Sequence, residues 1–230
     1  MRAKAMSDGR LEAVLWDLDG VIADTADYHY RAWEDIFKEK GVTFTREDFM
    51  RHFGQRHDTI IRFALGGNIP PDEFEVITER KQQEYRRLVA KNIKPLPGAI
   101  ELIKSLNNYH IKTAIASSAP LENVEIIIRG LGIEACFQAI ACGTEVPEGK
   151  PSPQIFLRAA QKLGVEPGNC AVIEDAIAGV AAAKRAGMKC VAVTNSHPGS
   201  SLKKADLIVD TLEVVGIGDL DGLFRSAKSG

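Results

Sequence analysis

Short apolar runs alternate with helix-forming segments along the second half of the chain. The apolar runs are "IKTAIASS", "AIACG", "CAVIED", "KCVAVT" and "ADLIVD", and the segments between them carry apolar residues at helical spacing. Parallel strands need connections of this length, so the alternation predicts a parallel sheet with helices on both faces. Near the N-terminus, "LEAVLW" is a further apolar run that we expect to form a buried strand of the same sheet.

Residues 26–94 lack this alternation and are predicted to be helical. "ADYHYRAWEDIFKEKG" has apolar residues at helical spacing, and "TREDFMRHFG" opens with a capping-box pattern from Thr45 to Asp48. "PPDEFEVITERKQQEYRRLVAKN" begins with prolines, which suit the first turn of a helix. The sequence therefore predicts an α/β core domain of residues 1–25 and 95–230, interrupted by a helical domain of residues 26–94.

The composition excludes several classes of partner. A chain of 230 residues with a formal net charge of -2 has no basic footprint for nucleic acid or for an anionic membrane. We find no apolar run of the roughly 18–20 residues that a membrane span needs. The start, "MRAKAMSDGR", lacks the apolar stretch of a secretory signal, and the 4 cysteines form no CxxC pair. We expect buried free thiols and a cytoplasmic protein.

Polar side chains follow several of the predicted strands at the point where each strand ends, and a lysine lies in the loop before a following helix. These residues are Asp17, Asp19, Ser117, Ser118, Lys150, Glu174 and Asp175. In parallel sheets the carboxyl ends of the strands meet at one edge, where ligands bind. We therefore expect these side chains to share one pocket.

This set of residues favours phosphoryl transfer. Four carboxylates without a neighbouring His or Cys are hard oxygen ligands, which suit Mg²⁺. Asp17 would attack phosphorus to give an aspartyl phosphate, and Asp19 would protonate the leaving oxygen and later deprotonate water. Lys150 and Ser117 would bind the phosphoryl oxygens.

Each residue also has a plain structural explanation when it is taken alone. Paired aspartates often hold turns or cap helices, Ser117 could cap a helix, and Lys150 could be a solvated loop charge. The pair Glu174-Asp175 could be an N-cap. A calcium-binding EF-hand loop is excluded, since Val21 and Tyr28 occupy its fifth and twelfth positions. The order of all these residues on one α/β pattern is what favours catalysis.

Four ordered motifs, "DLDGV", "IASS", "GKPSP" and "IEDAIAG", make the chain resemble the haloacid dehalogenase-like superfamily. The resemblance covers nearly the whole chain and points to the β-phosphoglucomutase-like branch, whose members carry a helical cap. It implies a doubly wound, Rossmann-like α/β core with an inserted all-helical cap domain, and it implies a monomer. Dehalogenases of this superfamily lack the second aspartate, so Asp19 argues for phosphoryl transfer.

The resemblance also implies roles for individual residues. Asp17 corresponds to the nucleophile and Asp19 to the general acid and base, while Ser117 and Lys150 correspond to the phosphoryl-binding pair. The implied Mg²⁺ ligands are Asp17, the backbone carbonyl of Asp19, Glu174 and Asp175.

In the cap, the resemblance suggests residues that would contact the sugar. His29, Trp33 and Lys81 match such positions, and "FGQRHDT" places His57 and the adjacent Arg56 where mutases carry a loop arginine. Packing in the cap core remains an alternative for Trp33, and His29 fits either role.

Two departures bear on the reaction. Mutases of this branch carry a lysine and an asparagine soon after the second motif, which grip the second phosphate of the substrate, whereas this chain has Pro120 and Leu121. We therefore expect a Mg²⁺-dependent phosphatase of a small sugar phosphate or related phosphorylated metabolite. The alternative is a β-phosphoglucomutase, which converts β-glucose 1-phosphate to glucose 6-phosphate. A non-catalytic binding protein on the same fold is a third hypothesis.

Overall fold

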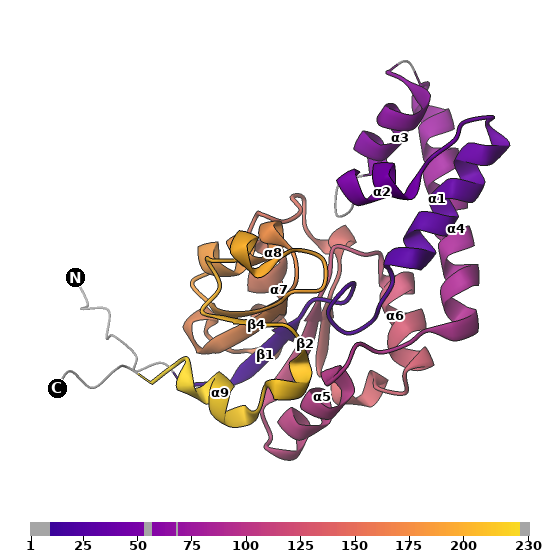
Figure 1. The fold of residues 1–230 in the computed structure, drawn as a ribbon. Helices are drawn as coiled ribbons and strands as arrows, with labels where there is room; N and C mark the ends of the chain where they lie inside the picture. Colours follow the sequence, from indigo (N-terminus) through magenta and orange to yellow (C-terminus); the bar gives the residue numbers. More distant parts are fainter. Residues whose placement is uncertain (1–9, 53–56, 68, 226–230) are drawn as a thin grey trace. The chain divides into compact units, whose positions relative to one another are not determined.

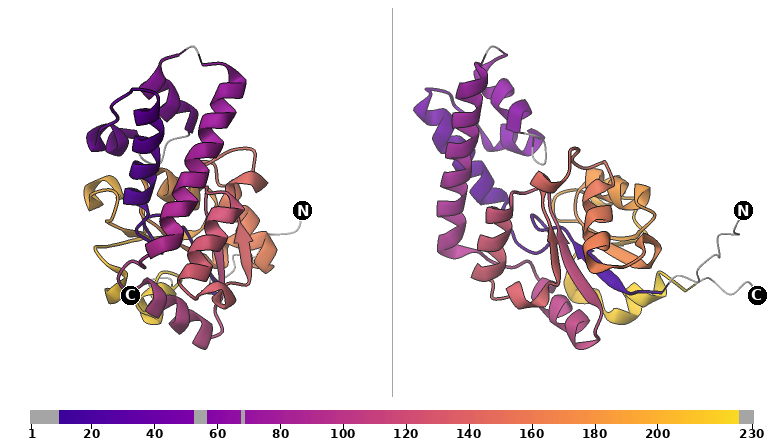
Figure 2. Two further views of the ribbon diagram at one scale, coloured as in Figure 1. Left: turned by 90° about the vertical axis from the view of Figure 1, so that its right-hand side faces the viewer. Right: turned by 180° about the vertical axis from the view of Figure 1, so that it is seen from behind.

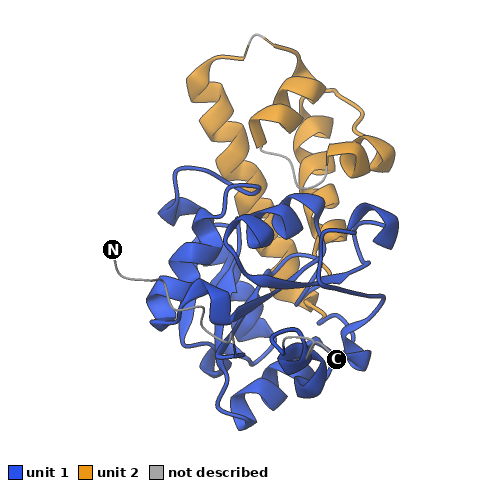
Figure 3. Ribbon diagram, turned by 90° about the vertical axis from the view of Figure 1, so that its left-hand side faces the viewer, with its two compact units in different colours: residues 1–23, 95–230 blue, residues 24–94 orange. Residues whose placement is uncertain are grey.

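The computed structural model describes residues 10–52, 57–67 and 69–225, which fall into two compact units (Figure 3). Unit 1 comprises Met1–Ala23 and Pro95–Gly230, and unit 2 comprises Asp24–Lys94. The chain thus leaves unit 1 soon after its first strand and returns to it to form the remaining strands.

Within its described residues, unit 1 contains a six-stranded sheet in which every neighbouring pair is parallel. The strands are β1 (Ala13–Trp16), β2 (Lys112–Ala116), β3 (Ala139–Ala141), β4 (Cys170–Glu174), β5 (Lys189–Val193) and β6 (Leu207–Val209). Their spatial order is β3-β2-β1-β4-β5-β6. The chain therefore builds outward from β1 in one direction and then in the other. The reversal places a topological switch point between β1 and β4, where open α/β sheets bind ligands.

Helices cover both faces of this sheet (Figure 1; Figure 2). The α-helices of unit 1 are α5 (Ala99–Asn108), α6 (Leu121–Gly130), α7 (Gln154–Leu163), α8 (Ile177–Arg185) and α9 (Ile217–Gly222). Short 3₁₀ turns are η1 (Glu134–Cys136), η2 (Gly143–Glu145), η3 (Pro167–Asn169), η4 (Gly199–Ser201) and η5 (Leu212–Val214). The α/β fold predicted from the alternating pattern is confirmed.

The core of unit 1 follows the alternation of side chains along β1. Ala13 and Leu15 lie in one buried cluster with residues of α7 and α8, such as Phe156 and Val180. Val14 and Trp16 are equally buried and point to the opposite face, which α5 covers. A strand buried on both faces must be apolar throughout, which explains the uninterrupted apolar run in the sequence.

Unit 2 contains helices α1 (Ala26–Glu39), α2 (Arg46–His52), α3 (His57–Leu65) and α4 (Pro71–Asn92). The predicted capping box at the start of α2 is confirmed. The Thr45 N–H donates to Asp48 Oδ2 at 3.0 Å, and the Asp48 N–H donates to Thr45 Oγ1 at 3.1 Å. His57, which the resemblance places in a cap loop, is the first residue of α3.

Two further expectations concern cysteines and membranes. All four cysteines are free thiols, and burial raises the pKa of Cys170 to about 12. Cys142, Cys170 and Cys190 are buried, whereas Cys136 is partly exposed. Among the residues that the structure describes, no helix combines the length and apolar character needed to cross a bilayer.

Candidate active site

The carboxyl ends of β1 and β4 bring three acidic side chains together. Trp16 pairs with Ile173, and the Asp17 N–H donates to the Ile173 carbonyl at 3.0 Å, so Asp17 lies level with Glu174. One carboxylate oxygen each from Asp17, Glu174 and Asp175 lie within 4.8 Å of one another. All three residues are buried. Carboxylates this close repel one another unless positive charge lies among them.

Lys150 supplies part of that positive charge. Its Nζ donates to Asp17 Oδ1 at 2.5 Å and to Glu174 Oε1, and its side chain is only 10% exposed. Burial lowers the pKa of Lys150, but the charges of Asp17 and Glu174 outweigh burial and raise it above its ordinary value. The lysine therefore stays protonated, and the alternative of a solvated loop charge is excluded.

Glu174 is held from several sides. Its Oε2 accepts the N–H groups of Asp175 and Ala176, each at 2.9 Å, while its Oε1 accepts from Lys150. Ala176 is the N-cap of α8 and has no side-chain oxygen, so Glu174 satisfies a backbone donor there. A Cβ on Gly179 would lie 1.8 Å from Glu174 Oε1. The first turn of α8 can pack on this carboxylate only because residue 179 is glycine.

Among the described residues, the acids of this cluster outnumber the cationic side chains that pair with them. Burial raises the pKa of Asp17 well above its usual range, with Lys150 opposing this and the neighbouring acids adding to it. Burial, followed by the charge of Glu174, raises the pKa of Asp175 to about 7. Three buried carboxylates thus face the ammonium of Lys150. Closely spaced hard oxygens with excess negative charge fit a divalent cation such as Mg²⁺.

Asp19 lies in a tight turn directly after β1. The Leu18 carbonyl accepts the N–H groups of Val21, Ile22 and Ala23, and Gly20 has a φ of +79° that side chains other than glycine rarely adopt. Asp19 is partly exposed, and its charge contributes to the raised pKa of Asp175. The turn therefore places the second aspartate at the same edge of the sheet.

The serine pair follows β2, the other neighbour of β1. Ser117 is buried, and its Oγ accepts the Ala119 N–H at 3.1 Å. The N-cap of α6 is Pro120, so Ser117 does not cap that helix. Ser118 is exposed, and its carbonyl oxygen would lie 2.2 Å from a Cβ on Gly143. Ser117 is thus the serine fixed at the strand end.

Two residues of the site were not predicted. Ser196 Oγ donates to Asp175 Oδ2, and Asn195 Nδ2 donates to the Gly20 carbonyl at 2.8 Å. Both lie in the loop after β5, the strand next to β4. The signal was present, because "TNSH" directly follows the apolar run of β5.

Within unit 2, four of the predicted cap residues lie close together. Lys81 is buried, and its Nζ lies 2.8 Å from His29 Nδ1, so the ammonium donates to that ring nitrogen. Lys81 Nζ also lies 5.4 Å from the centre of the Trp33 ring, and the His57 ring meets Trp33 edge-on at 5.3 Å. Trp33 belongs to the apolar core of unit 2. The fifth residue, Arg56, lies outside the described residues.

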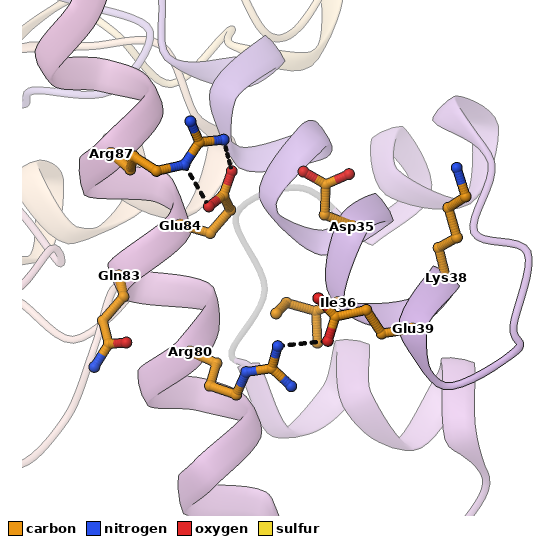
Figure 4. Close-up of a pocket in the computed structure, with 8 residues that line it drawn as sticks. All are labelled: Asp35, Ile36, Lys38, Glu39, Arg80, Gln83, Glu84 and Arg87. Carbon is orange, nitrogen blue, oxygen red and sulfur yellow. Dashed lines mark hydrogen bonds and ion pairs between the residues drawn. The ribbon is translucent and has the colours of Figure 1, made fainter.

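A surface cavity of about 720 Å³ lies between α1 and α4 of unit 2 (Figure 4). Across it Arg80 pairs with Glu39, and Arg87 pairs with Glu84 on its own helix. Asp35 and Lys38 also line the cavity, so its acidic and basic groups balance. The cavity therefore lacks the net positive charge expected of a phosphate site.

The parallel sheet of this order, with a buried lysine and acidic cluster at its switch point, places the chain among α/β proteins that bind ligands at the carboxyl ends of their strands. The sequence model of the haloacid dehalogenase-like hydrolase family matches residues 11–187, and the chain belongs to this family. The resemblance based on the four motifs is confirmed.

The chain is similar to curated and solved members of that family. It is 39% identical over 207 residues to β-phosphoglucomutase from Bacillus subtilis, an alignment that covers 86% of this chain and 89% of the relative. It is 29% identical over 200 residues to a phosphorylated carbohydrates phosphatase from Thermotoga maritima, covering 86% and 93%. The structure of CbbY from Rhodobacter sphaeroides in complex with xylulose-(1,5)bisphosphate superposes with a TM-score of 0.84 at 29% identity, covering 92% of this chain and 99% of that chain.

Proposed function

We propose that this protein is a Mg²⁺-dependent phosphatase that removes the phosphoryl group from a small phosphorylated sugar. The observation that carries the proposal is the buried cluster of Asp17, Lys150, Glu174 and Asp175 at the switch point of the sheet. A carboxylate held beside an ammonium and two further acids is suited to attack a phosphate ester once positive charge neutralises the pair. The relatives named above include a phosphatase of phosphorylated carbohydrates.

In the first half-reaction, Asp17 attacks phosphorus, and a bond forms between its carboxylate oxygen and the phosphorus atom. The bond from phosphorus to the sugar oxygen breaks, and Asp19 gives its proton to that leaving oxygen. Lys150 and Ser117 hold the phosphoryl oxygens during the transfer. The dephosphorylated sugar then leaves, and an aspartyl phosphate remains on Asp17.

In the second half-reaction, Asp19 accepts a proton from a water molecule whose oxygen attacks the phosphorus of the aspartyl phosphate. The bond from phosphorus to the Asp17 oxygen breaks, which regenerates the carboxylate and releases inorganic phosphate. Asp19 ends this half-reaction protonated and is ready for the next substrate. Atoms and protons therefore balance over the two steps.

The residues proposed to hold Mg²⁺ are Asp17, the backbone carbonyl of Asp19, Glu174 and Asp175. Among the described contacts, Asp175 Oδ1 accepts no hydrogen bond and Glu174 Oε1 accepts one, from Lys150, so each of these oxygens has a lone pair left for a cation. Bound Mg²⁺ would supply positive charge against the attacking carboxylate and the phosphoryl group.

Substrate choice is assigned to unit 2, the region that corresponds to the helical cap of residues 26–94. The supporting observation is the contact between Lys81 and His29, because a buried ammonium beside an imidazole can bind sugar hydroxyls or a phosphate. Arg56 and His57 are proposed to contribute further, and Trp33 to hold the Lys81 stem. The free thiols favour a cytoplasmic enzyme, and the resemblance favours a monomer.

A second candidate is β-phosphoglucomutase activity, which the 39% identity to the Bacillus subtilis enzyme favours. Both reactions share the first half and differ in what accepts the phosphoryl group from Asp17. Pro120 and Leu121 replace the polar pair that grips a second phosphate in mutases, so water is the preferred acceptor in this proposal.

The test is turnover of β-glucose 1-phosphate with Mg²⁺ and a trace of glucose 1,6-bisphosphate, followed by a panel of sugar phosphates. Free phosphate and glucose 6-phosphate are measured in parallel. Phosphate release that vanishes with EDTA and in Asp17→Asn supports the phosphatase. Glucose 6-phosphate without phosphate release would establish the mutase instead.

The matched control is Asp72→Asn, which makes the same change at an exposed position of α4. It should leave turnover unchanged. If no phosphate ester in the panel reacts, or if Asp17→Asn retains wild-type turnover, the proposed reaction is wrong.

A further inference from the structure

The loop after β5 contacts both Asp175 of the acidic cluster and the turn that follows β1. Glu174 of β4 pairs with Ala192 of β5, so the residues that follow β5 lie beside Asp175. The loop is anchored at its start, because Thr194 donates its N–H to Val209 at 3.0 Å and its hydroxyl to Asp210 at 2.7 Å. An anchored loop can fix the side chains that it touches.

Ser196 contacts Asp175 directly. Its Oγ donates to Asp175 Oδ2, and among the described residues no other side chain donates a hydrogen bond to that carboxylate. The carboxylate of an aspartate can rotate about the Cβ–Cγ bond. A fixed hydrogen-bond donor to one of its oxygens favours one orientation of the group. The hydroxyl therefore determines where the other oxygen, Oδ1, points.

Asn195 contacts the turn that follows β1. Its Nδ2 donates to the Gly20 carbonyl at 2.8 Å, in the turn that carries Asp19. The turn after β1 also packs closely against Asp175 and Ser196. A Cβ on Gly20 would lie 2.0 Å from Asp175 Oδ2 and 3.1 Å from Ser196 Oγ. Two neighbouring residues of one loop thus hold Asp175 and the β1 turn at a fixed spacing.

We propose that Ser196 and Asn195 are positioning residues that set the geometry of the metal site. Ser196 orients the Asp175 carboxylate, and Asn195 holds the turn after β1 in register with it. The inference rests on the proposed function, since the metal site belongs to the same reaction. Residues that orient metal ligands in this way typically change metal affinity by about 10–100-fold when they are removed.

The experiment measures metal binding without substrate. Mn²⁺ is titrated into the full-length protein, and free Mn²⁺ is followed by electron paramagnetic resonance. Ser196→Ala should raise the Kd for Mn²⁺ by about tenfold, and it should raise the Mg²⁺ concentration needed for half-maximal phosphate release by a similar factor. The kcat at saturating Mg²⁺ should remain close to that of the wild type, because Ser196 touches no reacting atom in the proposed mechanism.

Two variants separate positioning from general structure. Ser200→Ala removes an exposed hydroxyl from η4, and it should leave the Kd unchanged. Ser196→Thr keeps a hydroxyl at the critical position and should recover most of the affinity. Asn195→Ala should weaken Mn²⁺ binding by a smaller factor, because this side chain is exposed and its hydrogen bond competes with water.

A wild-type Kd in Ser196→Ala would overturn the proposal, as would equal weakening in Ser196→Ala and Ser200→Ala. The absence of Mn²⁺ binding by the wild-type protein would also overturn it. The proposed reaction is judged separately, from the loss of phosphate release in Asp17→Asn, which does not depend on the behaviour of Ser196.

Discussion

Gly179→Ala should destabilise the protein, although the same change usually stabilises a helix. Gly179 lies within α8, where alanine is favoured over glycine by about 1 kcal/mol at an exposed position. Here the new Cβ would lie 1.8 Å from Glu174 Oε1 and 1.9 Å from its Cδ, far inside any normal contact. The fully buried Glu174 carboxylate must therefore move.

The magnitude follows from what Glu174 would lose. Overpacking of a buried site costs roughly 1–3 kcal/mol, and loss of a charge-assisted hydrogen bond costs roughly 1.5–3 kcal/mol. After subtraction of the helix-propensity gain, we expect a net loss of about 1.5–5 kcal/mol in the free energy of unfolding. Because Glu174 also pairs with Lys150, phosphate release should fall with stability.

The assay is urea unfolding monitored by circular dichroism, with phosphate release measured on the same preparations. The matched control is Gly218→Ala, because Gly218 is also helical and nothing lies within 4 Å of its added Cβ. Gly218→Ala should be neutral or slightly stabilising. If Gly179→Ala were as stable as wild type and fully active, Glu174 could not lie against α8 as described.

Two further changes test the ion pair at η2 and the buried lysine of unit 2. Burial raises the pKa of Glu145, but hydrogen bonds from Lys162 at 2.7 Å and Arg158 at 3.2 Å outweigh it and lower that pKa to about 2. A depressed pKa stabilises the fold above the unfolded pKa, near 4.5, and this stabilisation disappears as the pH falls toward 2. Glu145→Gln should therefore lower the free energy of unfolding by about 1–2 kcal/mol at pH 7, after allowance for solvent screening. In urea unfolding, the difference from the wild type should shrink between about pH 5 and pH 2. A difference that does not change with pH would contradict this. Lys81→Met keeps the length of the side chain but removes the donor to His29, so stability should be retained while kcat/KM for the best sugar phosphate falls by about 10–100-fold. Unchanged kcat/KM would remove Lys81 from the substrate site.

The acidic cluster could be predicted because it depends on topology more than on exact boundaries. In a parallel sheet of order β3-β2-β1-β4-β5-β6, the residue after β1 lies next to the end of β4, so Asp17 and Glu174 meet even if a strand begins a residue later than expected. The first strand does begin later, at Ala13, while the predicted run starts at Leu11. The end of the strand, which positions Asp17, is unaffected.

The contacts that support the cluster could not be predicted in the same way. The clash that makes glycine necessary at residue 179 depends on the position of the Glu174 carboxylate to within an ångström, which no sequence pattern specifies. Ser196 and Asn195 were not predicted for a different reason. Neither residue is acidic, and their loop carries none of the four motifs, although it follows a buried strand as the recognised site residues do.

The choice between water and a sugar as the phosphoryl acceptor depends on a different part of the molecule. In the proposed mechanism, the cluster around Asp17 forms the aspartyl phosphate in either case. A mutase must also keep hold of a bisphosphate while the sugar turns over, which requires donors for the distal phosphate. Pro120 caps α6 without an N–H, and Leu121 is 40% exposed and apolar, so neither side chain can donate such a hydrogen bond. With the distal phosphate less firmly held, the sugar leaves more readily and water takes the phosphoryl group, which is the physical basis for preferring hydrolysis.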